Sequence, residues 1–149
     1  MTTHVTHTGP SVAGRRAGYA VAMAVNLVLL FLVNVSPGWQ AVPFLTESTT
    51  EVLLLVNLTM LVAVVANAVY SVFDPPWVRA LGDAVTTSVG LASLVRIWQV
   101  FPFDFDTTSV PWDLLARWVI GVGIVGCVVA IIVALARFVR ALAAPEADR

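Results

Sequence analysis

The sequence has no lysine, a single cysteine and few charged residues of any kind. All eight basic residues are arginines, and charged residues make up 11% of the 149 positions, whereas 59% are apolar. A soluble domain of this length needs far more polar surface, so this composition excludes one. The lone Cys127 excludes an intramolecular disulfide. Arginine without lysine, together with abundant alanine and valine, favours a bacterial source with a GC-rich genome.

The chain also lacks the residue patterns that enzymes and cofactor sites need. It contains no nucleophile–base constellation, no phosphate-binding loop and no group of metal ligands. The two histidines, His4 and His7, have no further ligand nearby, and neither lies in a long apolar run, which excludes a membrane haem held by histidines. We therefore expect a protein that is not an enzyme, with no cofactor, no metal and no nucleic-acid partner.

Four long apolar runs occupy most of the chain. Each holds about 20 residues, enough for an α-helix to cross a ~30 Å hydrocarbon core. Lipid cannot satisfy backbone polar groups, so the runs must be helical, and the prolines fall between them. The sequence thus predicts an all-α membrane protein, a bundle of four transmembrane helices. The expected spans are about 17–36, 52–72, 80–100 and 114–136, in a single domain 14–142 with a disordered tail 1–13 and a tail 143–149.

The charged residues outside the runs are distributed asymmetrically. The first flank, the second connection and the final segment hold arginines: Arg15, Arg16, Arg79, Arg137, Arg140 and Arg149. The other two connections have no basic residue but contain acidic ones: Glu47, Glu51, Asp104, Asp106 and Asp113. Because positive charge resists translocation, we expect a multi-pass protein of the inner (plasma) membrane with both termini in the cytoplasm.

A six-residue motif, W-Q-x-x-P-F, occurs twice. Residues 39–44 read WQAVPF and residues 98–103 read WQVFPF, and the chain has no other glutamines. Both copies stand where an odd-numbered span gives way to an outer connection. This pattern is compatible with two parallel two-helix repeats. The alternative is that the two connections acquired similar residues independently, because aromatic and proline residues are favoured at the membrane interface and in loops. The sequence leaves both interpretations open.

Polar residues near the outer ends of the spans are candidates for a recognition site. Arg96 lies inside the third span, where an arginine is costly, so it needs a partner such as Glu51, Asp113 or a bound anion. Arg117 follows Asp113 at the favourable i, i+4 spacing. The candidate outer polar cluster comprises Gln40, Glu51, Arg96, Gln99, Asp113 and Arg117.

The asparagines form a second candidate group, an intramembrane polar strip. All of them lie in the first two spans: Asn26, Asn34, Asn57 and Asn67. Because consecutive spans run antiparallel, Asn34 and Asn57 should reach similar depth near the outer side, with the other two deeper. The strip either forms interhelical hydrogen bonds, worth ~0.6 kcal/mol each, or lines a cavity.

These observations predict a non-enzymatic integral membrane protein, a small binding, scaffold or accessory subunit with a recognition site on its outer face. The alternative is an oligomeric pore or facilitator for a small solute or ion, lined by Asn26, Asn57, Asn67 and Thr87. Stripes of small residues on the first and fourth spans suit close helix packing within the chain or between chains. Besides the lipid bilayer, the expected partners are therefore a second copy or another membrane protein.

Overall fold

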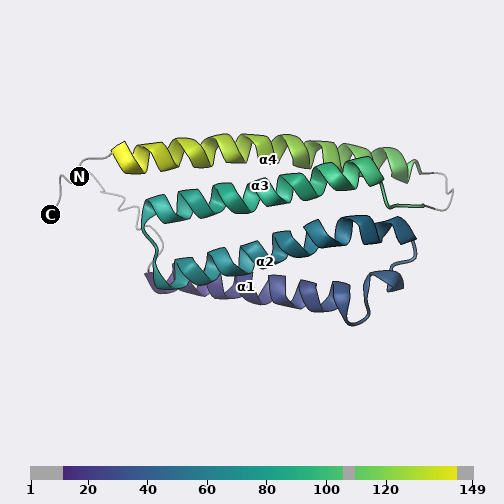
Figure 1. The fold of residues 1–149 in the computed structure, drawn as a ribbon, viewed down its shortest axis with the longest axis horizontal. Helices are drawn as coiled ribbons and strands as arrows, with labels where there is room; N and C mark the ends of the chain where they lie inside the picture. Colours follow the sequence, from purple (N-terminus) through teal and green to yellow (C-terminus); the bar gives the residue numbers. More distant parts are fainter. Residues whose placement is uncertain (1–11, 106–109, 144–149) are drawn as a thin grey trace, which may run out of the picture.

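In the computed structural model, which describes residues 12–105 and 110–143, the chain forms four long helices (Figure 1). They are α1 (Val12–Asn34), α2 (Thr50–Val72), α3 (Pro76–Val100) and α4 (Trp112–Ala143), with short 3-10 helices η1 (Trp39–Ala41) and η2 (Glu47–Thr49) between α1 and α2. All four long helices are long and apolar enough to cross a membrane. His4, His7, Asp106 and Arg149 lie outside the described residues, as do most of the two expected tails.

Several helices begin or end away from the limits of the apolar runs. The third helix begins at Pro76 rather than at residue 80, because a proline in the first turn lacks only an N–H that would have no helical partner there. The fourth helix continues to Ala143, well past residue 136. The first helix ends at Asn34, before a loop in which Gly38 has a φ of 81° that favours glycine. Apolar runs mark the hydrocarbon layer, whereas helices extend into the headgroup region.

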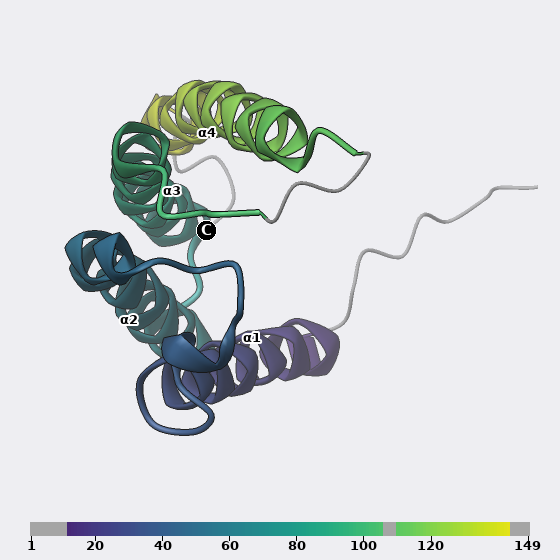
Figure 2. The same cartoon turned by 90° about the vertical axis from the view of Figure 1, so that its right-hand side faces the viewer.

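The long helices pack in chain order, α1 on α2, α2 on α3 and α3 on α4. Helices α1 and α4 lie at opposite edges, so the bundle is open on one side (Figure 2). A closed four-helix bundle would bring these two helices together, and α1 has no buried residue. In lipid no hydrophobic force drives helices to close a ring, so specific contacts decide how far a bundle closes.

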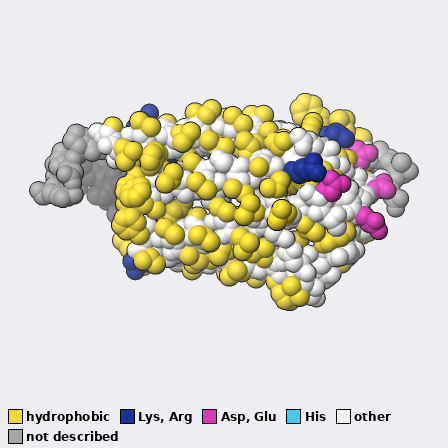
Figure 3. Space-filling view, in the orientation of Figure 1, with side chains coloured by type: hydrophobic (Ala, Val, Ile, Leu, Met, Phe, Trp, Pro, Cys, Tyr) yellow, Lys and Arg dark blue, Asp and Glu magenta, His cyan; other side chains and the backbone are white. Residues whose placement is uncertain are grey.

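The outer surface of the helices is predominantly apolar (Figure 3). Large side chains project from it, among them Leu54 (77% exposed) and Val72 (85% exposed). Apolar patches of this extent are rare on monomeric soluble proteins, whereas a lipid-facing surface requires them. Four helices of this length and this surface are compatible with a multi-pass integral membrane protein.

The two ends of the molecule differ in charge. At one end α1 begins and α4 ends (Figure 1); we call it the basic end, defined by Arg15, Arg16, Arg79, Arg137 and Arg140. The opposite end, the loop end, carries the α1–α2 and α3–α4 connections, and on the face shown in Figure 3 the acidic side chains gather there, with basic side chains beside them. Each end holds polar contacts of its own.

Candidate functional site

At the loop end the two connections that carry the W-Q-x-x-P-F motifs bind one another. Leu45 and Phe103 form an isolated antiparallel β-bridge. Backbone hydrogen bonds flank it, from Thr46 N to Pro102 O (3.1 Å) and from Asp104 N to Phe44 O (2.9 Å). Two segments far apart in the sequence thus form one structure, the loop cap, which comprises residues 35–49 and 101–105.

Aromatic side chains reinforce the loop cap. The ring of Phe105 stacks on Phe44 and Phe103 at centroid distances of 5.4 and 5.8 Å, and Phe101 meets Phe103 edge-on at 5.4 Å. Phe101 also ends α3, because its left-handed conformation (φ 45°) and the following Pro102 stop the helix. Pro102 is fully buried. Backbone hydrogen bonds and ring stacking therefore hold the two connections of the loop cap together.

The two motif copies have different backbone conformations. Residues 39–41 form η1, whereas residues 98–100 are the last turn of α3. The shared letters therefore do not produce the same local structure. What the copies share is a Pro-Phe pair in the loop cap, where the rings of Phe44 and Phe103 lie 6.5 Å apart.

Beneath the loop cap lies a cavity of about 500 Å³ between α1, α2 and α3. Its lining is almost wholly apolar and includes Trp39, Leu45, Val52, Val56, Pro102 and Phe103. The one hydroxyl in the lining belongs to Thr49, which is 5% exposed and whose Oγ1 has no hydrogen-bond partner among the described residues. The sequence did not predict this cavity, because it exists only where the two loops meet.

Of the six residues of the candidate outer polar cluster, Arg96 and Glu51 form an ion pair. Arg96 Nη2 lies 2.8 Å from Glu51 Oε2, so one of the two carboxylates considered is its partner. The side chains are 41% and 54% exposed, so the pair lies on the flank of α2 and α3 rather than inside the bundle. Among the described residues, no hydrogen bond or ion pair connects Gln40, Gln99 or Asp113 to this pair.

Arg117 has a different partner from the one that its spacing predicted. Its guanidinium carbon lies 4.0 Å from the ring centroid of Phe101 and 5.7 Å from that of Trp98. No ion pair joins it to Asp113 within the part of the chain that the structure describes. Over these two aromatic faces the cation is stabilised without a carboxylate.

The asparagines form one interhelical pair and no continuous strip. Asn34 and Asn57 exchange two amide hydrogen bonds of 2.9 and 2.7 Å between α1 and α2. Asn26 and Asn67 instead donate to the carbonyl oxygens of Ala22 and Ala63, one turn earlier in their own helices. Asn67 and Thr87 also line a groove of about 540 Å³ on the open side of the bundle.

The basic end holds a polar network that the sequence did not reveal. The carboxylate of Asp74 accepts hydrogen bonds from the Tyr19 hydroxyl (2.9 Å) and from Arg15 Nε (3.1 Å), and it lies 3.0 Å from Arg79 Nε. Partial burial raises the pKa of Asp74, but the hydrogen bonds and the two positive charges outweigh it, so the pKa is lowered overall. Asp74 thus joins α1 to the α2–α3 turn.

A second contact at this end fixes the spacing of α2 and α3. The hydroxyl of the buried Tyr70 lies 3.1 Å from Asp83 Oδ1 and 3.2 Å from the Arg79 carbonyl oxygen. Its ring meets Tyr19 edge-on at 5.5 Å. A Cβ at Gly82 would overlap the Tyr70 hydroxyl and ring, so only glycine fits.

The described residues contain no group of three or more histidine, cysteine, aspartate or glutamate side chains that could hold a metal ion. No protein-family model matches the chain, and neither a curated protein nor a solved structure matches it. What the protein does is therefore inferred from its own geometry.

Proposed function

We propose that this protein is a non-enzymatic binding subunit of a membrane, which takes an apolar group of a small ligand or partner at its loop end. The observation that carries the proposal is the cavity of about 500 Å³ beneath the loop cap. Its volume falls in the range typical of small-molecule sites, and both motif-bearing connections contribute to its walls. Such a cavity suits binding, because its lining side chains include no acid or base, and their polar groups are the Thr49 hydroxyl and the Trp39 indole N–H.

Rigidity of the loop cap supports the same proposal. The β-bridge, the buried Pro102 and the phenylalanine stack hold the cavity walls before any ligand arrives. A preformed site loses little conformational entropy on binding. A loop cap of this kind also suits a recognition surface better than it suits a wide aqueous mouth.

The proposed orientation has the loop end outside and the basic end in the cytoplasm. Five arginines lie at the basic end, whereas the described connections at the loop end carry Glu47 and Asp104 but no basic residue. Glu51 and Asp113 lie beside them in the first turns of α2 and α4, and the arginines nearest this end, Arg96 and Arg117, lie within α3 and α4. This asymmetry follows the positive-inside rule. The recognition site would then face the exterior of the cell.

Photolabelling with an alkyl diazirine, a small apolar probe, tests the proposed site on protein reconstituted in liposomes. We expect adducts on the peptides that contain Trp39 and Phe103. Val56→Phe, which places a larger side chain in the cavity, should lower this labelling about tenfold, equivalent to ~1.4 kcal/mol of binding. Leu54→Phe is the matched control, because Leu54 is 77% exposed and does not line the cavity. Equal labelling of both variants would contradict the proposal.

A pore remains the second candidate because Asn67 and Thr87 meet on the open-side groove. A second copy that covered this side would enclose their polar groups. Our proposal predicts no appreciable ion or small-solute flux through liposomes that contain the purified protein. Sustained flux that Asn67→Leu abolishes would establish the pore and overturn the binding role.

A further inference from the structure

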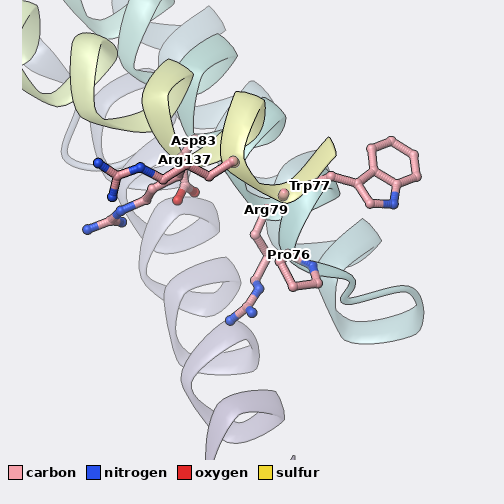
Figure 4. A pocket seen from close by; sticks show the side chains of 8 residues that line it. Pro76, Trp77, Arg79, Asp83 and Arg137 are labelled. Atoms are coloured by element: carbon pink, nitrogen blue, oxygen red, sulfur yellow. The ribbon is translucent and has the colours of Figure 1, made fainter. Parts of the chain in front are cut away.

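We propose that the basic end carries a separate binding site, a groove between α3 and α4 that takes the phosphate headgroup of an anionic lipid. The groove has a volume of about 590 Å³. Arg79, Arg137 and Arg140 line it together with Asp83, Trp77 and Ala141. In Figure 4 the side chain of Arg137 extends to the left beside Asp83 and that of Arg79 extends downward, whereas Trp77 points to the opposite side.

The charges of the groove favour an anion. Three arginines face one carboxylate, and that carboxylate, Asp83, already accepts a hydrogen bond from Tyr70 at 3.1 Å. Arg79 is shared with Asp74, at 3.0 Å. Arg137 and Arg140 have no ion-pair or hydrogen-bond partner among the described residues. Their guanidinium groups therefore retain the donors that bind phosphate oxygens in pairs.

The position of the arginines along α4 favours a lipid as the source of the phosphate. Helix α4 has 32 residues, about 48 Å at the helical rise, which exceeds a ~30 Å hydrocarbon core. Its last turns, which hold Arg137 and Arg140, therefore reach the headgroup layer. Arg79 lies at the same end in the first turn of α3. Basic grooves between transmembrane helices at this depth bind acidic headgroups.

The competing interpretation is that these arginines are only general anchors of the helix ends. A general anchor acts through its charge alone, so any arginine at this end would serve equally well. A specific site depends on where its arginines lie, so only the arginines of the groove would contribute to binding of the lipid. Arg16 separates the two interpretations, because it lies at the basic end on α1 and outside the groove.

Native mass spectrometry of the full chain in detergent, with added phosphatidylglycerol or phosphatidylcholine, tests the site. We expect the protein to retain phosphatidylglycerol in preference to phosphatidylcholine. Arg137→Gln and Arg140→Gln should each weaken retention about fivefold, whereas Arg16→Gln should leave it unchanged. Ala141→Trp should also weaken retention, because it fills the groove without altering its charge.

Two results would overturn the proposal. An equal loss in Arg16→Gln would show that the charge of this end acts without a specific site. Displacement of phosphatidylglycerol by millimolar inorganic phosphate would assign the groove to a free anion rather than to a lipid. Unchanged melting temperatures of the variants would exclude misfolding as the cause of lost retention. This site lies at the opposite end from the loop-cap cavity, so either proposal can fail without the other.

Discussion

At the residue scale, close approach between two helices depends on one glycine. Tyr70 is 6% exposed and fills the space above Gly82, where its hydroxyl reaches Asp83 and the Arg79 carbonyl. Helix association in lipid depends on such packing and hydrogen bonds rather than on hydrophobic force. A single methyl group at this position should therefore disturb the α2–α3 contact.

Gly82→Ala should lower the free energy of unfolding by about 1–3 kcal/mol, the usual cost of overpacking. Denaturant unfolding in a non-ionic detergent, followed by tryptophan fluorescence, would measure the change. Gly126→Ala is the matched control, because a Cβ there meets no atom within 4 Å. Alanine should stabilise that helix position by roughly 0.5–1 kcal/mol. Equal destabilisation by both changes would show that the Tyr70 contact does not determine the packing.

At the element scale, the Asp74 turn connects three helices. Tyr19 and Arg15 reach it from α1, and Arg79 reaches it from α3. Helix α1 has no buried residue, and these contacts together with the Asn34–Asn57 pair connect it to α2 and α3. The stability of α1 packing should therefore depend on the charge of one carboxylate.

The lowered pKa of Asp74 predicts a loss of stability in acid. A carboxyl group with a lower pKa in the folded state stabilises the fold above its ordinary value of 3.8, and this contribution is lost as the pH falls through the lowered pKa. Unfolding measured from neutral pH to below 3.8 should show this decline. Asp74→Asn should be less stable at neutral pH and should lack that component of the decline. Asp113→Asn, at an exposed position of α4, should keep the wild-type profile. An unaltered decline in Asp74→Asn would assign the acid sensitivity to other groups.

At the scale of the whole molecule, an even number of spans brings the start of α1 and the end of α4 to the same end (Figure 1). The charge asymmetry then decides which end stays inside. Single cysteines introduced in a Cys127→Ser background would report which end of the molecule lies inside the cell. Ala41 and Ala143 are suitable positions for these cysteines, because both are exposed and lie at opposite ends. Thr49, also at the loop end, is unsuitable because it is buried and a reagent would not reach it.

An impermeant maleimide should label Ala41→Cys on intact cells and should label Ala143→Cys only after the membrane is permeabilised. The expected contrast follows from the arginines of the basic end, which resist translocation. Labelling of Ala143→Cys on intact cells, without labelling of Ala41→Cys, would reverse the orientation and move the loop-cap cavity to the cytoplasmic side.

The sequence by itself determined that the chain forms four long apolar helices and where each connection lies. Hydrocarbon thickness and the need to satisfy every backbone group leave no other structure for these runs. The similar depth of Asn34 and Asn57 followed from antiparallel spans, and the two amides bind each other. These properties depend on local sequence and on the membrane, so a single sequence contains them.

Only the tertiary structure decided which side chains meet. It selected Glu51 as the partner of Arg96, placed Arg117 over Phe101, and brought Arg15 to Asp74. It also left α1 and α4 apart and formed the loop cap from two distant connections. In lipid, apolar faces attract one another no more than they attract the bilayer. Helix rotation and loop pairing therefore depend on specific long-range contacts, which apolar runs and residue spacing do not encode.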